Sequence, residues 1–173
     1  MRRVRYQVAC SLDGYIAGPN GEADWIIMDP DIDFTALFGQ FDAMLMGRKT
    51  FEAMAGQGQG GGMPAMKTYV FSKTLKGGDH RSVTIVNGDP AATVGGLKAK
   101  QGKDIWLFGG GALFRSFLEL GLVDTVEPAV IPVLLGGGIP LLPAPAARAK
   151  LKLTSHRLYP KTGIVLLEYA VLK

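Results

Sequence analysis

The sequence predicts an α/β fold: a sheet with a parallel core, antiparallel strands at its carboxyl end, and helices on its flanks. Short apolar runs alternate with helix-like segments as far as Asp124, which is the pattern of parallel strands joined by helices. After Asp124 the chain continues as strands and turns, which indicates antiparallel pairing. The chain has 173 residues, 47% of them hydrophobic, enough for one core, so we expect residues 1–173 to form a single domain.

The first half of the chain begins with a strand. Residues 4–10 alternate in the way expected of a half-buried strand. Further along, Phe34, Leu37, Phe38 and Phe41 recur at helical spacing and predict a short helix. The later elements expected in this half are that helix over 31–40, a strand over 43–46, a helix over 48–55 and a strand over 68–72.

The second half continues the alternation and then changes. Asp89 is placed to cap a helix that Pro90 opens at its first position. The other elements expected are strands over 83–86 and 104–108, a helix over 113–120 that Gly121 ends, and a final hairpin that turns at Pro160-Lys161-Thr162-Gly163. This order gives the parallel core first and the antiparallel extension last.

Composition excludes several classes of protein. The formal net charge is only +4, and lysines and arginines nowhere cluster with aromatic residues, so we expect no nucleic-acid partner. The single cysteine, Cys10, favours a reducing, cytoplasmic compartment. Two histidines and one cysteine are too few for a structural zinc site, so we expect no metal. The apolar runs are too short to cross a membrane.

Three segments rich in hydrogen-bond donors each follow a predicted strand. They are Gly47-Arg48-Lys49-Thr50, Ser72-Lys73-Thr74 and Gly109-Gly110-Gly111. Because ligands of open α/β sheets bind beyond the carboxyl ends of the strands, we expect these segments to meet and bind a ligand with several phosphates. The alternatives are a glycine turn that requires positive φ and cations that simply face solvent.

Another glycine-rich stretch has a different interpretation. Gly56-Gln57-Gly58-Gln59-Gly60-Gly61 matches the pattern G-x-G-x-x-G of dinucleotide-binding proteins. It follows a predicted helix rather than a strand, and it leads into Met63-Pro64. We therefore expect a flexible loop there, and no phosphate site.

Acidic residues gather in the segment before the first predicted helix. They are Glu22, Asp24, Asp29, Asp31 and Asp33, with Trp25 among them. Most acids of this kind are solvated or cap a helix, as Asp31 or Asp33 is placed to do. One carboxylate that faces a pocket would instead bind the N–H groups of a heterocycle.

Taken together, these residues resemble a known family. The chain is similar to the dihydrofolate reductase fold, and specifically to stand-alone proteins related to the reductase half of the bifunctional riboflavin-biosynthesis deaminase-reductase. The resemblance covers nearly the whole chain. It rests on Ser11-Leu12-Asp13-Gly14-Tyr15-Ile16-Ala17, Met46-Gly47-Arg48-Lys49-Thr50-Phe51-Glu52, Val70-Phe71-Ser72-Lys73-Thr74-Leu75, residues 109–114, and Pro132-Val133-Leu134-Leu135-Gly136.

The resemblance implies NADPH as the hydride donor. The cations and hydroxyls of residues 48–49 and 72–73 then lie near the adenosine 2′-phosphate, Thr50 and residues 109–113 near the pyrophosphate, and Ala9 and Ile16 near the nicotinamide. The residues expected against NADPH are Ala9, Ile16, Gly47, Arg48, Lys49, Thr50, Ser72, Lys73, Thr74, Gly109, Gly110, Gly111, Ala112, Leu113 and Phe114.

The same resemblance suggests a substrate site. Asp31 is aligned with the carboxylate that orients a pterin, with Asp29 and Asp33 as alternatives, and Trp25 and Phe34 form the expected walls. The folate enzymes carry an arginine that binds the glutamate tail where this chain has Met66, so we expect poor turnover of dihydrofolate.

The sequence thus favours an NADPH-dependent reductase of a pterin-like, pyrimidine-like or similar heterocyclic or carbonyl small molecule, like the 5-amino-6-(5-phosphoribosylamino)uracil reductases. The alternatives are a dinucleotide-binding regulatory module without catalysis, and a true dihydrofolate reductase. Residues 126–142 carry one charge, Glu127, and are otherwise apolar or rich in glycine and proline, which favours a homodimer over a buried strand.

Overall fold

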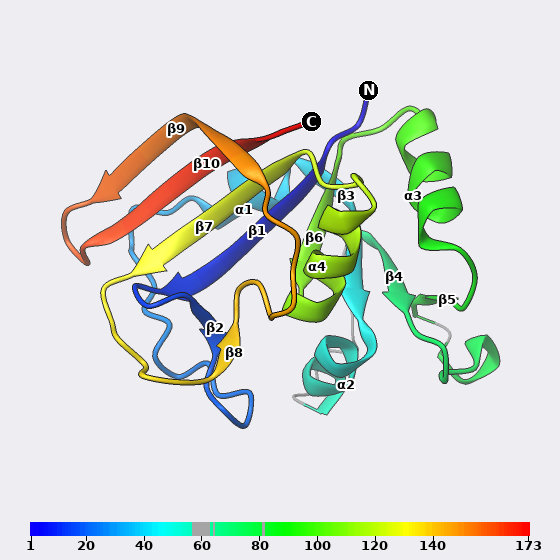
Figure 1. Cartoon of the computed structure of the whole chain (residues 1–173), viewed down its shortest axis with the longest axis horizontal. Helices are drawn as coiled ribbons and strands as arrows, with labels where there is room; N and C mark the ends of the chain where they lie inside the picture. Colours follow the sequence, from blue (N-terminus) through cyan, green and yellow to red (C-terminus); the bar gives the residue numbers. More distant parts are fainter. Residues whose placement is uncertain (57–62, 64, 81) are drawn as a thin grey trace.

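The computed structural model describes residues 1–56, 63, 65–80 and 82–173 (Figure 1). Of the glycine-rich stretch over residues 56–61, only Gly56 is therefore among the described residues. The strands are β1 (Val4–Ser11), β2 (Tyr15–Ala17), β3 (Phe41–Gly47), β4 (Lys67–Phe71), β5 (Thr84–Val86), β6 (Asp104–Gly109), β7 (Thr125–Ile131), β8 (Ile139–Pro140), β9 (Lys150–Tyr159) and β10 (Ile164–Leu172). The helices are α1 (Phe34–Phe38), α2 (Arg48–Gly56), the 3₁₀ helix η1 (Gly77–Asp79), α3 (Pro90–Ala99) and α4 (Gly111–Glu119).

Eight strands form one sheet in the order β5-β4-β3-β6-β1-β7-β10-β9, and β2 pairs with β8 beside it. The six strands from β5 to β7 are parallel. The last two, β10 and β9, are antiparallel and are joined at Pro160-Lys161-Thr162-Gly163. The predicted fold class, a parallel core with antiparallel strands at the carboxyl end, is confirmed.

The two faces of the sheet carry different layers. In Figure 1, α3 and α4 lie in front of the sheet and α1 lies behind it. Under α3 and α4 the core includes Tyr6 and Phe117, both fully buried. On the α1 face, Met44 and Met46 pack with Trp106. Because side chains alternate along a strand, the central strands β3, β4 and β6 supply both cores. This explains why their sequences are mostly apolar.

The first helix is shorter than its apolar spacing predicts. Asp33 caps it by accepting a hydrogen bond from the backbone N–H of Ala36, and the helix ends at Phe38. Phe41 shares the helical spacing but lies one residue beyond the expected helix over 31–40, and it begins β3. Its ring centroid lies 5.6 Å from that of Trp106, so Phe41 faces the same core from a strand. Phe38 in α1 and Phe41 in β3 thus pack into the same core around Trp106, and their helical spacing does not require a continuous helix.

The capping predictions for the second half hold. The Asp89 side chain accepts from two backbone N–H groups at the start of α3, and Pro90 is the first helical residue. Gly121, with φ of +67°, follows α4, which begins two residues earlier than expected. Within the described residues, no helix is long and apolar enough to cross a membrane.

Candidate functional site

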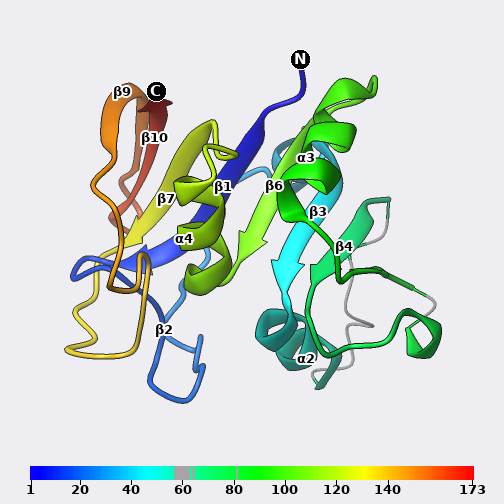
Figure 2. The same cartoon turned by 45° about the vertical axis from the view of Figure 1, so that its right-hand side comes forward.

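The carboxyl ends of neighbouring parallel strands bring the three donor-rich segments to one edge of the sheet. Strands β4, β3 and β6 are adjacent, and in their registers Gly47 lies opposite Phe71 while Met46 lies opposite Gly109. Figure 2 shows α2 directly below the ends of these strands. Segments 47–50, 72–74 and 109–111 therefore leave the sheet side by side, as the sequence predicts.

The three glycines after β6 serve close packing. None of them has a φ in the left-handed region, so the alternative of a turn that requires positive φ is wrong. A Cβ atom on Gly110 would lie 3.2 Å from Thr50 Oγ1, and one on Gly111 would lie 2.6 Å from the carbonyl oxygen of Pro140. The glycine segment is thus pressed between the first turn of α2 and the strand β8.

The first turn of α4 follows directly. Its N-cap is Gly110, so no side chain of the capping residue occupies the N–H groups of Gly111, Ala112 and Leu113. Phe114 was also expected at the cofactor but lies elsewhere. Its ring stacks on Tyr6 at a centroid distance of 3.9 Å, and the residue is 3% exposed. The Phe114 side chain thus faces the core and packs α4 against β1.

At the start of α2, the cations differ in their contacts. Arg48 Nη1 lies 2.9 Å from both carboxylate oxygens of Glu52, one helical turn later. Lys49 is exposed, and its ammonium group pairs with no side chain of the described residues. A cation at a helix N-terminus opposes the helix dipole, and Glu52 offsets that conflict for Arg48. The Arg48 side chain is therefore partly committed within its own helix.

The segment after β4 has a defined shape. Ser72 Oγ accepts hydrogen bonds from the backbone N–H groups of Thr74 and Leu75. The side-chain amide of Asn87 donates to the carbonyl oxygens of Ser72 and Leu75, at 2.6 and 3.0 Å. Lys73 and Thr74 are left exposed on this turn. Sequence reasoning missed Asn87, although its position directly after β5 was a signal for a role at this edge.

The three candidate acids have separate tasks. Asp33 caps α1, as described above. Asp29 is 2% exposed and accepts from Thr162 Oγ1 at 2.6 Å and from the backbone N–H of Asp31 at 2.8 Å. The hydrogen bond from Thr162 lowers the pKa of Asp29. The exposed Asp31 carboxylate pairs with Lys161 Nζ at 2.8 Å, and this hydrogen bond raises the pKa of Lys161. Asp29 thus holds its segment against the β9–β10 turn, and Asp31 faces outward.

The expected walls of the substrate site lie on the α1 face. Trp25 and Ala9 pack into one cluster around Ile131 and Ile164, and Trp25 Nε1 donates to the carbonyl oxygen of Glu22 at 3.0 Å. Phe34 lies on α1, with its ring 5.8 Å from that of Phe38. The structure therefore brings Trp25 to Ala9, whereas Phe34 borders the neighbouring apolar cluster through Phe38.

Sequence reasoning assigned no role to Asp13, which joins two loops at the carboxyl edge. Its carboxylate accepts from Ser11 Oγ and from the backbone N–H groups of Leu135 and Gly136. The hydrogen bond from Ser11, followed by that from Leu135, lowers the pKa of Asp13. Ile16, expected near the nicotinamide, lies beside this contact in β2. The signal available in the sequence was an acid between a strand and Gly14.

A buried polar network was also missed. Arg5 makes two hydrogen bonds to Glu127, each 2.7 Å long, between the adjacent strands β1 and β7. Burial lowers the pKa of Arg5, but the hydrogen bond and the charge of Glu127 outweigh it, and the pKa is raised. Glu127, the one charge in an apolar segment, signalled a buried partner.

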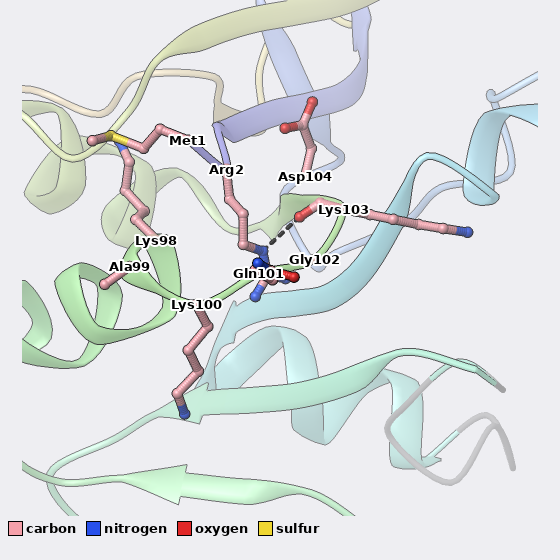
Figure 3. Close-up of a pocket in the computed structure, with 9 residues that line it drawn as sticks. All are labelled: Met1, Arg2, Lys98, Ala99, Lys100, Gln101, Gly102, Lys103 and Asp104. Carbon is pink, nitrogen blue, oxygen red and sulfur yellow. Dashed lines mark hydrogen bonds between the residues drawn. The ribbon is translucent and has the colours of Figure 1, made fainter.

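A hollow of about 530 Å³ lies at the opposite, amino-terminal edge of the sheet (Figure 3). Its cationic side chains are largely engaged in contacts that stabilise the fold. Arg2 Nε donates to the carbonyl oxygen of Lys103 at 2.6 Å and the same guanidinium pairs with Asp42. Lys98 pairs with Asp124 at 2.6 Å. These contacts fasten the chain start to β3 and to the loop after α3, and α3 to the loop before β7, away from the donor-rich edge.

Comparison with known proteins agrees with this architecture. The profile of the RibD C-terminal domain matches residues 2–165. The uncharacterized protein YyaP of Bacillus subtilis (strain 168) is 38% identical over 97% of this chain and 94% of its own. A crystal structure from Shewanella sp. PV-4, described as a riboflavin biosynthesis protein, is 26% identical with a TM-score of 0.83, and the match covers 100% of both chains.

A second solved structure identifies the wider fold. Dihydrofolate reductase from Enterococcus faecalis, complexed with NADP(H), has a TM-score of 0.71 and 15% identity over 99% of this chain and 97% of its own. This similarity concerns the fold alone. With the profile match and the Bacillus relative, it leads to one conclusion: the chain belongs to the RibD C-terminal domain family and has a dihydrofolate reductase-like fold.

Proposed function

We propose that this protein is an NADPH-dependent reductase of a pyrimidine-like or pterin-like heterocycle. The observation that carries the proposal is the meeting of segments 47–50, 72–74 and 109–111 at one edge of the sheet. The backbone N–H groups of the glycine segment, the hydroxyl groups and the ammonium groups together form the set of hydrogen-bond donors that phosphates require. Membership of a reductase family supports an oxidoreductase rather than a dinucleotide-binding regulatory module without catalysis.

The residues at this edge fit a phosphorylated dinucleotide. Gly110 has no side chain that could cover Thr50 Oγ1, and the N–H groups of Ala112 and Leu113 start α4, so Thr50 and α4 would hold the pyrophosphate. Lys73, with Arg48, would hold the 2′-phosphate. Bound NADPH would supply the hydride, and the protein supplies binding and orientation.

The remaining residues would serve the substrate. Ala9 on β1 and Ile16 on β2 would border the nicotinamide. Trp25 and Phe34 would exclude water from the α1 face, since both rings are half-buried there. Asp31 would orient the substrate or hold a proton, because its carboxylate is exposed and only Lys161 is recorded as its side-chain partner within the described residues.

Two measurements test the proposal. Fluorescence titration should show tighter binding of NADPH than of NADH, and NADPH oxidation should proceed with at least one member of a panel of pterins, flavin precursors and ketones. Tight NADPH binding without oxidation across the panel would favour the regulatory module. Equal dissociation constants for NADPH and NADH would remove the argument from the 2′-phosphate site.

We also propose that the protein forms a homodimer, through the outer strand β9. In the segment 126–142 that the sequence suggested, Leu134 is exposed, but residues 126–131 lie in β7, inside the sheet between β1 and β10. In contrast, Leu151, Leu153 and Leu158 on the outer strand β9 are 42%, 47% and 58% exposed. Lys150, Lys152 and Arg157 project from the other face of β9, so two copies would meet through the leucine face without repulsion between these like charges.

A further inference from the structure

Gln7 carries a buried hydrogen-bond acceptor that the fold leaves unused. The residue is 8% exposed, and its Oε1 atom has no hydrogen-bond partner among the described residues. Buried side-chain oxygens are nearly always paired, because an unpaired one loses its bonds to water without compensation. The exception therefore requires an explanation at this position.

The network around Glu127 fixes the orientation of the Gln7 amide. The Glu127 carboxylate accepts from Arg5, from Thr125 Oγ1 at 2.6 Å and from Gln7 Nε2 at 3.3 Å. A carboxylate in an ion pair accepts hydrogen bonds and donates none, so it selects the NH₂ end of the amide. Oε1 is consequently the end that points away from Glu127.

The position of Gln7 relates it to the expected substrate site. Gln7 and Ala9 lie two residues apart on β1, so their side chains share the α1 face of the sheet. Ala9 packs in the cluster that contains Trp25. On the other side, Trp106 Nε1 donates to the backbone carbonyl of Gln7 at 2.9 Å. Gln7 therefore lies on the α1 face beside Ala9 and Trp106, and the Trp106 ring stacks on Phe38 of α1.

We propose that Gln7 Oε1 accepts a hydrogen bond from a ring N–H or amino group of the substrate and determines specificity for N–H-bearing heterocycles. The inference rests on the proposed function, and it narrows the substrate class. A simple ketone has no donor to offer, so its binding leaves Oε1 unpaired. A site that hydrogen-bonds a polar group of its substrate strongly rejects an analogue without that group. An apolar pocket discriminates less strongly between ligands that differ only in size.

The experiment is a binding measurement that does not depend on turnover. The fluorescence of Trp25 and Trp106 would be titrated with 6-aminouracil and with 6-(dimethylamino)-1,3-dimethyluracil, which lacks every N–H group, each in the presence of NADP⁺. We expect the wild type to prefer 6-aminouracil at least about tenfold. Gln7→Met, similar in length but without the amide, should reduce that preference to about twofold.

Gln40→Met is the matched control. Gln40 contacts the same network, since its Oε1 accepts from Arg5 Nη1 at 2.6 Å, but it is exposed and lies between α1 and β3. This variant should keep the full preference. A wild type without the preference, or one that binds neither uracil, would overturn the proposal. So would a Gln7→Met variant that keeps the preference and differs only in thermal stability, because the amide would then have a structural role.

Failure of the reductase assignment would be visible separately. If the uracil preference depends on Gln7 but NADPH is neither bound nor oxidised, the role of Gln7 stands and the proposed function falls. If NADPH is oxidised with heterocycles and the preference is unaffected in Gln7→Met, the proposed function stands and the role of Gln7 falls.

Discussion

The backbone N–H of Gly136 donates a 2.8 Å hydrogen bond to Asp13 Oδ2, across 123 residues of sequence. The neighbouring N–H of Leu135 donates to the other oxygen, Oδ1, at 3.1 Å. Asp13 lies in the loop after β1, and Gly136 lies in the loop between β7 and β8. One carboxylate therefore fastens together two loops that border the expected nicotinamide end of the site.

Replacing Asp13 with Asn should weaken its hold on the loop that contains Leu135 and Gly136. The asparagine NH₂ group would face one of the two backbone N–H groups, because an amide offers one acceptor oxygen where the carboxylate offers two. We expect a lower melting temperature at pH 7 and a higher KM for NADPH. Thermal unfolding followed by circular dichroism, with steady-state kinetics, measures both.

The effect should depend on pH with a definite sign. The pKa of Asp13 is lowered below its ordinary value of 3.8 in the folded state, so its contribution to stability is present above that value and disappears as the pH falls through the lowered pKa. The wild type and Asp13→Asn should therefore differ at pH 7 and converge as the pH falls, below 3.8, through the lowered pKa. A stability difference that stays constant over this fall in pH would contradict the assignment.

Asp29 and Asp31 form a matched pair for mutation. Asp31→Asn should leave the melting temperature nearly unchanged, since its pair with Lys161 is exposed. Its kcat in NADPH oxidation should fall by at least about tenfold if it orients the substrate. Asp29→Asn should instead lower the melting temperature, because the carboxylate is buried against Thr162. If Asp29→Asn lowered kcat and Asp31→Asn lowered the melting temperature, Asp29 would be the residue that orients the substrate and Asp31 the structural one.

Lys73 should carry selectivity for the cofactor. Lys73→Met removes an exposed ammonium beside Ser72, and its loss of a charge-assisted bond should cost about 1.5–3 kcal/mol in NADPH binding. Binding of NADH, which has no 2′-phosphate, should hardly change. Lys76→Met is the control, three residues along the same exposed loop. Equal losses for both cofactors would indicate a general effect on the loop.

Dihydrofolate should be a poor substrate. Met66 packs, half-buried, against the apolar cluster that contains Phe41 and Trp106, and it offers no donor to a glutamate tail. The missing pair should cost on the order of 2–4 kcal/mol in transition-state binding. A wild-type kcat/KM for dihydrofolate above about 10⁵ M⁻¹s⁻¹ would contradict this view of the pocket. Met66→Arg with no gain would show that another residue limits folate turnover.

The outer strand β9 should be essential for self-association. Leu153 lies opposite Tyr169, which lies opposite the buried Val126, so Leu153 projects on the face that carries α4. We expect the wild type to sediment at about twice 18.4 kDa at micromolar concentration, and Leu153→Lys at 18.4 kDa. Leu120→Lys, at an exposed leucine after α4, should remain dimeric. A monomeric wild type would refute the proposal.

Local signals predicted most of the fold. Asp89 and Pro90 start α3 through contacts within four residues, which a sequence reader sees directly. The pairing of Asp29 with Thr162 spans 133 residues and depends on how the β9–β10 turn reaches the α1 side, so no local pattern announces it. Phe114 was misplaced for a related reason: the motif fixed its position in the chain, but the direction of its side chain depends on Tyr6.

Helix α3 has a consequence for the order in which the protein folds. Two adjacent glycines, Gly95 and Gly96, are exposed within it, with no atom within 4 Å of where a Cβ would stand. Each lowers helix propensity by about 1 kcal/mol relative to alanine, so α3 has little stability of its own. Its buried residues, Val94 and Leu97, need the surface of the sheet. We expect α3 to form late, on a sheet already assembled, and substitution of either glycine by alanine should slow unfolding more than it speeds folding.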